Sequence, residues 1–163
     1  MSNHIIVNIK NQSLQVFEGL SETIVKEYRI ATAKNGPGEQ FGSECTPRGK
    51  HIIRAKIGAG EIENTVFVGR RPTGEVYSPK LKKAHPNRDW ILTRILWLSG
   101  KQPGFNRLGK LDTMRRYIYI HGCPEEDVMG VPSSHGCVKM RNTDVIELFE
   151  MIPVYTPIMI IEK

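Results

Sequence analysis

The sequence predicts a mainly β fold with one or two helices, arranged as a β-sandwich-like domain or a distorted barrel. Short runs of alternating or β-branched residues recur along most of the 163 residues, separated by polar or glycine-rich turns. Only one segment, near the carboxyl terminus, has apolar residues at helical spacing. No linker, repeat or low-complexity tract divides these runs, so we expect residues 1–163 to form a single domain.

The amino-terminal half reads as a series of short strands. Asn11-Gln12 separates the first two runs as a hairpin turn would. The segment 34–40 holds a Gly-Pro-Gly run and is expected to be a loop. The expected strands of this half are residues 4–10, 13–18, 23–31, 48–56 and 65–69.

The carboxyl-terminal half contains two strongly apolar strands. Residues 90–98 are apolar on both faces and are therefore expected in the centre of the sheet. Residues 99–113 are polar and glycine-rich, which predicts a long loop. Residues 116–120 form a β-branched and aromatic strand that runs directly into His121, and residues 157–162 are expected to be the closing strand.

The predicted helix follows residue 141. Asn142 or Thr143 would cap its amino end, because both side chains readily accept backbone N–H bonds. Pro153 would end it. The apolar stripe that would face the core consists of Val145, Leu148, Phe149 and Ile152.

The net charge of +6 favours an anionic partner. The basic residues cluster at 80–88 and 107–116, which indicates either a solvated surface or, for the first cluster, a lid over a substrate. The chain lacks a helix-turn-helix, a zinc-finger pattern and the aromatic interleaving of a single-strand binder, so no nucleic-acid partner is expected.

The expected location is the cytoplasm. The first ten residues show no basic segment followed by an apolar run and a small-residue cleavage site. No stretch approaches the roughly 20 apolar residues of a membrane span, so no membrane insertion is expected. A leader removed from the natural chain would instead place the protein in the periplasm.

The cysteines suit a reducing compartment. Cys45, Cys123 and Cys137 are odd in number and irregularly spaced, unlike the disulfide framework of a small secreted domain. At least one thiol is therefore free within the monomer. Cys45 is expected to be a passive thiol.

Two His-Gly-Cys triplets, at 121–123 and 135–137, are the densest concentration of reactive side chains. Histidine and cysteine are good zinc ligands, but the chain lacks a Cys-x-x-Cys or His-x-x-x-His clip. We therefore expect no metal site and no cofactor. A zinc-stabilised adaptor remains the alternative from this pattern.

Nucleophilic catalysis fits the two triplets better. A strand end would hold His121 rigidly, and a turn would expose the Cys137 thiol. An adjacent imidazole can lower the pKa of a thiol so that it ionises near neutral pH. The backbone N–H groups around Gly136 and Cys137 would stabilise an oxyanion. A single buried cysteine is ordinarily inert packing, but the turn and the second histidine favour a reactive one.

The chain resembles the L,D-transpeptidase (YkuD-domain) family. The resemblance lies chiefly in Ile120-His121-Gly122 and in Ser134-His135-Gly136-Cys137-Val138. Three weaker elements occur in the family's order: residues 11–17, Thr46-Pro47-Arg48-Gly49, and residues 153–161.

This resemblance implies a β-rich catalytic domain that acts on peptidoglycan stem peptides or muropeptides. Cys137 would attack the bond between meso-diaminopimelate and D-alanine and form a thioester. His121 would be the base and later the acid, oriented by the carbonyl of Gly122, while Ser134 and His135 would shape the pocket. Water or the amine of a second stem would then accept the acyl group.

The chain departs from the family pattern at two positions. Lys139 stands where arginine is usual, and with Arg141 it is expected to bind the substrate carboxylate. Cys123 replaces a common threonine. Cys123 would either fill a small pocket or face Cys137 and form a reversible disulfide.

The favoured interpretation is an L,D-carboxypeptidase that trims stem peptides during cytoplasmic murein recycling. The first alternative is a transpeptidase that forms 3-3 cross-links. A second alternative, of a different class, is a non-catalytic peptidoglycan-binding or zinc-binding module.

Overall fold

Within residues 3–163 the fold consists of ten strands in one sheet, two α-helices and one 3-10 turn. The computed structural model describes residues 3–163. The elements are β1 (His4–Asn8), β2 (Ser13–Phe17), β3 (Ile24–Ala31), β4 (Gly49–Ile57), β5 (Thr65–Val68), β6 (Arg71–Val76), α1 (Pro79–Ala84), β7 (Ile91–Gly100), η1 (Gly109–Leu111), β8 (Tyr119–Gly122), β9 (Val138–Met140), α2 (Asn142–Met151) and β10 (Pro157–Ile161).

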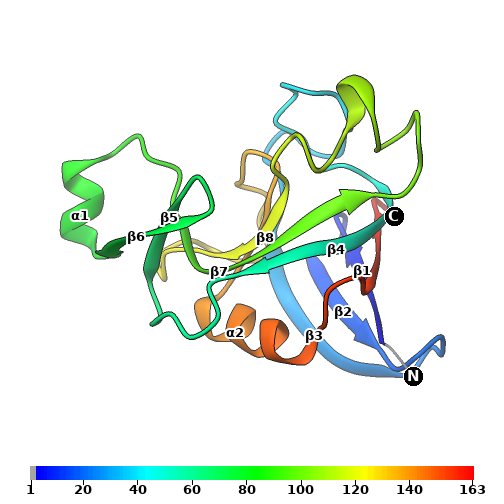
Figure 1. The fold of residues 1–163 in the computed structure, drawn as a ribbon, viewed down its shortest axis with the longest axis horizontal. Coiled ribbons are helices and arrows are strands. Elements are labelled where there is room, and N and C mark those ends of the chain that lie inside the picture. The colour runs from blue at the N-terminus through cyan, green and yellow to red at the C-terminus, as the bar shows by residue number, and fades with distance from the viewer. Residues whose placement is uncertain (1–2) are drawn as a thin grey trace.

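The sheet closes on itself. Its order is β4-β10-β1-β2-β3-β9-β8-β7-β5-β6, and an additional pairing joins β4 to β7. A barrel-like ring is therefore formed by β4, β10, β1, β2, β3, β9, β8 and β7. The β5–β6 hairpin continues the sheet beyond this ring, where β5 pairs with the first residues of β7 (Figure 1). The predicted mainly β class with one or two helices is confirmed.

One hydrophobic core fills the ring. Alternate residues of each strand point inward, as the iBiBi burial of β1 and β2 shows. The predicted apolar stripe of α2 packs onto this core beside β7 and β8. The fully buried side chains of the core include Ile5, Leu14, Ile30, Ile53, Leu96, Leu98, Ile120, Met140 and Leu148.

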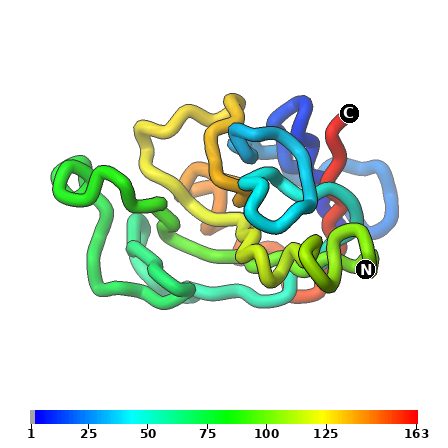
Figure 2. Tube along the Cα trace, turned by 90° about the horizontal axis from the view of Figure 1, so that it is seen from above, coloured from blue at the N-terminus to red at the C-terminus, as the bar shows by residue number. Residues whose placement is uncertain are grey.

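A lobe made of β5, β6 and α1 projects to one side of the ring (Figures 1 and 2). The sequence did not predict β6, whose proline, glycine and exposed residues hide its pattern. The sequence analysis also predicted a loop or a lid for residues 80–88, where the structure has α1. The Ser78 side chain caps α1 by accepting the Leu81 N–H, and Pro79 is the first residue of this helix. The basic residues of the segment gave no helical pattern in the sequence.

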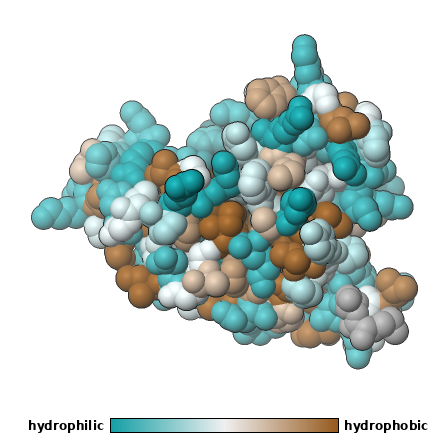
Figure 3. All heavy atoms as spheres, viewed as in Figure 1, coloured by the Kyte–Doolittle hydropathy of each residue, from teal (hydrophilic) through white to brown (hydrophobic). Residues whose placement is uncertain are grey.

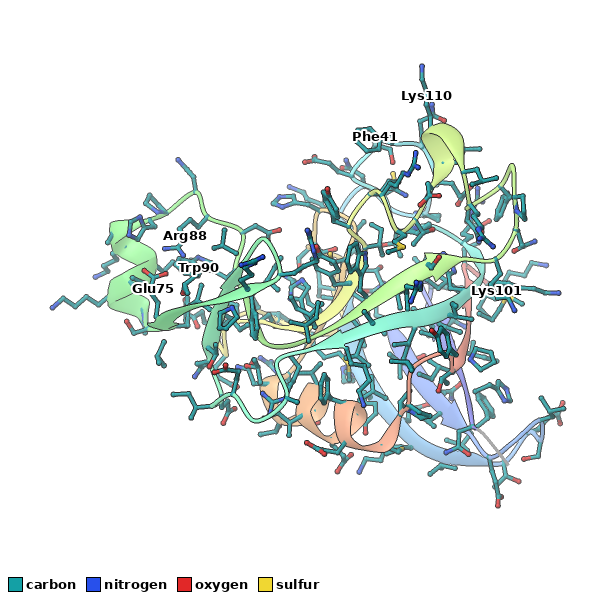
Figure 4. The ribbon with its side chains drawn as sticks, viewed as in Figure 1. Phe41, Glu75, Arg88, Trp90, Lys101 and Lys110 are labelled. Carbon is teal, nitrogen blue, oxygen red and sulfur yellow. The ribbon has the colours of Figure 1, made fainter. Side chains whose placement is uncertain are left out.

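The lobe has its own packing. Arg88 forms an ion pair with Glu75 at 2.8 Å, and its guanidinium lies 4.7 Å from the centre of the Trp90 ring (Figure 4). Trp90 packs edge-on against Tyr77. These contacts hold the segment between α1 and β7 in place beside the face that carries the predicted site.

Two further predicted boundaries were wrong. The strand expected at 116–120 begins at Tyr119, because the Asp112 carboxylate accepts the Arg115 N–H and residues 113–117 form turns. Most of the segment 99–113 is irregular as expected, although β7 extends to Gly100 and η1 interrupts it. The remaining strand expectations agree with the structure to within about two residues, as is usual for strand ends.

Asn142 is not the cap of α2, and neither is Thr143. The N-cap position is Arg141, without a side-chain cap bond, and Asn142 is fully buried. Its Nδ2 donates to the Cys123 carbonyl at 3.0 Å and its Oδ1 accepts the Thr93 hydroxyl at 2.7 Å. Asn142 therefore joins α2 to β7 and to the end of β8.

The surface is largely polar on the face shown in Figure 3, with hydrophobic residues in small patches. No helix within residues 3–163 is long and apolar enough to cross a membrane.

We predict that Asn142→Ala lowers the free energy of unfolding by about 2 kcal/mol, because it leaves the Cys123 carbonyl without its Asn142 donor and the buried Thr93 hydroxyl without its acceptor. Thr143→Ala is the matched control, since Thr143 is exposed. Urea unfolding of both variants measures the difference. A larger loss in Thr143→Ala would restore its role as the cap.

Candidate active site

The site predicted from the sequence lies on the outer face of the barrel, where β8 and β9 run side by side. Ile120 and Val138 are register partners in this parallel pair, and both side chains lie in the barrel core. Strand side chains alternate between the two faces, so the neighbours of these residues point outward. Tyr119 and Cys137 accordingly pack with Ile95 in a separate cluster.

A recess of about 350 Å³ on this outer face contains both His121 and Cys137. Its volume falls within the range of small-molecule sites, about 300–1,000 Å³. The structure thus brings the predicted nucleophile and the predicted base into one cavity. The lining residues are Phe67, Gly69, Arg70, Asp89, Ile91, Ile95, Arg116, Tyr117, Ile118, Tyr119, His121, Ser134, His135 and Cys137.

His121 is buried near the end of β8, and its Nδ1 lies 2.6 Å from the carbonyl oxygen of Gly122. Because a carbonyl oxygen only accepts hydrogen bonds, Nδ1 carries the proton and Nε2 keeps its lone pair. Burial lowers the pKa of the imidazole below its usual value, and the Asp89 carboxylate opposes this shift. The ring is therefore neutral at pH 7 and able to accept a proton at Nε2.

Gly122 lies where a side chain cannot fit. A Cβ atom there would overlap Asn142 Oδ1 and lie 2.7 Å from the carbonyl oxygen of Leu92. Glycine lets the end of β8 approach β7 closely. This approach places the Gly122 carbonyl beside the imidazole.

The Cys137 thiol lies in the recess between two backbone groups. Its Sγ accepts the Tyr119 N–H at 3.3 Å and donates to the Tyr117 carbonyl at 3.4 Å. Burial raises the pKa of Cys137 to about 12; the Tyr119 N–H lowers it, the Asp89 carboxylate raises it and the Arg116 guanidinium lowers it. The resting pair is thus a neutral thiol and a neutral imidazole, not the thiolate that the sequence led us to expect.

The turn before Cys137 is closed by Ser134. The Ser134 hydroxyl donates to the Cys137 carbonyl and accepts the Gly136 N–H at 3.1 Å. The Gly136 N–H is therefore occupied, contrary to the expectation that it would help to bind an oxyanion. Among the residues that the structure describes, no group accepts the N–H of Cys137.

Two arginines that the sequence analysis did not select line the recess. Arg116 is half-buried and donates to the carbonyls of Cys45 at 2.6 Å and Gly38 at 3.2 Å. Arg70 donates to the Tyr119 hydroxyl at 3.0 Å. Within residues 3–163, neither guanidinium forms an ion pair with a carboxylate.

Arg70 is held in an unusual position. It occupies the left-handed region (φ 64°) in the two-residue turn between β5 and β6, a conformation that favours glycine or asparagine. Its guanidinium lies 4.7 Å from the centre of the Trp97 ring and 4.8 Å from that of Tyr117. No sequence signal near Arg70 points to the site, because its partners are distant in the chain. Arg116 belongs to the basic cluster 107–116 of the sequence analysis and lies three residues before Tyr119, which was the available signal for its place at the site.

Lys139 and Arg141 do not line the recess. The Lys139 ammonium pairs with Asp127 at 2.9 Å, and Arg141 donates to the Glu125 carbonyl at 2.8 Å. Both expected carboxylate binders are thus directed to other groups. His135 is exposed and lines the recess, and Ser134 lines it as well.

The two cysteines of the His-Gly-Cys triplets do not meet. Cys123 is buried with Ala31 and Met129, and its thiol donates to the Met140 carbonyl at 3.3 Å. Cys137 belongs to a different cluster, so the structure favours packing over a disulfide for Cys123. In the described part of the chain, no three histidine, cysteine or acidic side chains gather as metal ligands.

We predict that iodoacetamide alkylates Cys137 about tenfold faster for each pH unit between about pH 7 and 10. Only the thiolate reacts, and the pKa of Cys137, about 12, lies above this pH range. Peptide mass spectrometry separates this label from labelling at Cys45 and Cys123. A rate that already levels off below about pH 8 would contradict the neutral pair.

Comparisons with known proteins show the family to which the chain belongs. The YkuD family model, described as the L,D-transpeptidase catalytic domain, matches residues 2–160. A Bacillus subtilis relative named as an L,D-transpeptidase, YqjB, is 29% identical over 157 residues, 96% of this chain and 70% of the relative. YbiS of Escherichia coli K12, named as a probable L,D-transpeptidase, is 42% identical over 48 residues, 29% of this chain and 16% of that protein.

Solved structures show the same fold. An L,D-transpeptidase from Mycobacterium smegmatis aligns with a TM-score of 0.56 at 13% identity, covering 98% of this chain and 58% of that one. An Enterococcus faecium L,D-transpeptidase mutant aligns with a TM-score of 0.58 at 16% identity, covering 98% and 50%. This chain thus spans between half and three-fifths of those two structures. On the match of the family model over residues 2–160, the chain belongs to the YkuD family of L,D-transpeptidase catalytic domains.

Proposed function

We propose that the protein is a cysteine enzyme that cleaves peptidoglycan stem peptides by acyl transfer. The observation that carries this proposal is the single recess in which the Cys137 thiol lies with a neutral His121 whose Nδ1–H is fixed by the Gly122 carbonyl. Family membership supports the substrate class. In this proposal Cys137 is the nucleophile and His121 is its base.

The first half-reaction forms a thioester. His121 Nε2 takes the proton of the Cys137 thiol while the sulfur attacks the carbonyl carbon of diaminopimelate. The Cys137 N–H, which no group of the described residues accepts, would donate to the resulting oxyanion. The Asp89 carboxylate stabilises the imidazolium through its charge. When the intermediate collapses, the C–N bond breaks and His121 returns its proton to the amine of D-alanine.

The second half-reaction releases the acyl group. Neutral His121 takes a proton from the incoming nucleophile, which attacks the thioester carbonyl. The C–S bond then breaks, and the imidazolium returns the proton to the departing sulfur. Water as the nucleophile yields a shortened stem, and the amine of another stem yields a cross-link.

We propose hydrolysis as the principal outcome. A second recess of about 170 Å³ adjoins the first and shares Asp89, Ser134 and His135 with it. This volume is below that of ordinary ligand sites, about 300–1,000 Å³, and suits water better than an acceptor stem. Such trimming fits murein recycling in the cytoplasm, with cross-linking as the alternative outcome.

Arg70 and Arg116 replace Lys139 and Arg141 as the proposed carboxylate binders. Both line the recess, whereas Lys139 and Arg141 do not, and in the described residues neither of the two guanidinium groups pairs with a carboxylate. A guanidinium matches a carboxylate with two parallel hydrogen bonds. Stem peptides with free carboxylates are therefore the expected donors.

We predict that Cys137→Ala abolishes the release of D-alanine from a disaccharide tetrapeptide, while the folded state persists. Cys45→Ala is the matched control and should retain most activity, because the Cys45 side chain does not line the recess. Mass spectrometry with and without an acceptor stem distinguishes the products: loss of one D-alanine indicates hydrolysis, and a dimer indicates transpeptidation. D-alanine release by Cys137→Ala at a tenth of the wild-type rate would refute the proposed nucleophile.

We predict that Arg70→Met raises KM for a free-carboxylate stem about tenfold or more with a smaller change in kcat, as expected for a lost charge-assisted hydrogen bond. A stem whose diaminopimelate carboxylate is amidated should show a smaller difference between the two enzymes. Arg54→Met removes an exposed arginine as the control. Equal effects of Arg70→Met on both stems would exclude recognition of that carboxylate.

A further inference from the structure

Thr46, in the Thr46-Pro47-Arg48-Gly49 element, has no part in the reaction as described so far. Its side chain is fully buried. The hydroxyl donates to the Gly136 carbonyl at 2.9 Å and accepts the Ala33 N–H at 3.0 Å. Thr46 therefore connects a distant loop to the peptide group directly before the Cys137 nitrogen.

The position of the Thr46 hydroxyl is fixed by its own backbone. The Thr46 N–H donates to the Gly36 carbonyl at 3.0 Å, and its carbonyl accepts the Gly38 N–H at 2.9 Å. Arg116 also binds this loop, through the carbonyls of Gly38 and Cys45. The hydroxyl is thus a rigid reference point and not a mobile surface group.

The Gly136–Cys137 peptide has only limited freedom on its other side. Gly136 has a φ of 132°, and a Cβ atom there would lie 3.2 Å from the Cys45 carbonyl oxygen. The described chain contains no cis peptide bonds, and in a trans peptide the C=O and N–H vectors point in opposite directions. Because Thr46 holds the Gly136 oxygen, the Cys137 N–H must point away from Thr46.

That N–H is the donor that the proposed reaction needs. Within residues 3–163 no protein group accepts it, whereas the Gly136 N–H is occupied by Ser134. We propose that Thr46 is a positioning residue: its bond to the Gly136 carbonyl aims the Cys137 N–H at the developing oxyanion. The inference rests on acyl transfer at Cys137 but not on the identity of the natural substrate.

Two reagents separate this role from general support of the turn. Acylation of Cys137 by p-nitrophenyl acetate passes through a tetrahedral oxyanion, whereas alkylation by iodoacetamide displaces iodide at a saturated carbon and forms none. Rates at Cys137 are measured by peptide mass spectrometry, which excludes labelling at the other thiols. The ratio of acylation rate to alkylation rate reports oxyanion stabilisation.

Thr46→Val should lower this ratio about tenfold or more, since removing a whole oxyanion donor costs about 10²–10³-fold. Thr46→Ser keeps the hydroxyl and should keep the ratio within about twofold of wild type. Thr156→Val, which removes another buried hydroxyl that bonds the Pro153 carbonyl, is the matched control and should leave the ratio unchanged. If Thr46→Val does not fold, Thr46→Ser alone still tests the proposal.

An equal loss of both rates in Thr46→Val would show that Thr46 merely supports the turn. An unchanged ratio in Thr46→Val, or a tenfold lower ratio in folded Thr46→Ser, would also overturn the proposal. Wild-type enzyme that reacts with p-nitrophenyl acetate but leaves stem peptides intact would refute the proposed substrate and not this role of Thr46.

Discussion

The parallel pairing of β8 with β9 is the constraint on which the site depends. His121 and Cys137 are far apart in the chain, and only this pairing, with Ile120 opposite Val138, puts both side chains on the outer face of the barrel. A slip of one residue would turn Cys137 into the core and Val138 outward. Pairing of β3 with β9 and of β7 with β8 fixes the register from both sides.

Burial dominates the electrostatics of the pair. It is the largest influence on both groups, raising the pKa of Cys137 and lowering that of His121. The charges of Asp89 and Arg116 act in opposite directions on the thiol and are secondary. Both shifts favour a protonated Cys137 thiol at rest, and in the proposed mechanism this thiol would ionise only as the sulfur attacks. A thiol of this kind is protected from indiscriminate reaction, since the thiolate is the reactive form.

The local pattern in the sequence predicted most of the strands, though not β6 or β9, together with the apolar face of α2 and the motif that contains His121 and Cys137, because alternation and turn chemistry are local properties. The local pattern did not predict the roles of residues whose contacts are distant in the chain. Asn142 has the chemistry of a helix cap, yet burial between β7 and β8 gives it another use. Arg70 lines the recess from the turn between β5 and β6, and Lys139 forms an ion pair with Asp127. Neither outcome is visible in the neighbouring residues.

The most direct test of the account is the intact mass of the enzyme after rapid acid quenching during turnover of a stem tetrapeptide. The account predicts a covalent adduct whose mass equals the donor minus D-alanine, located on the peptide that contains Cys137 and absent from Cys137→Ala. Formation of the shortened stem without any such adduct, or an adduct that persists in Cys137→Ala, would contradict catalysis through a Cys137 thioester.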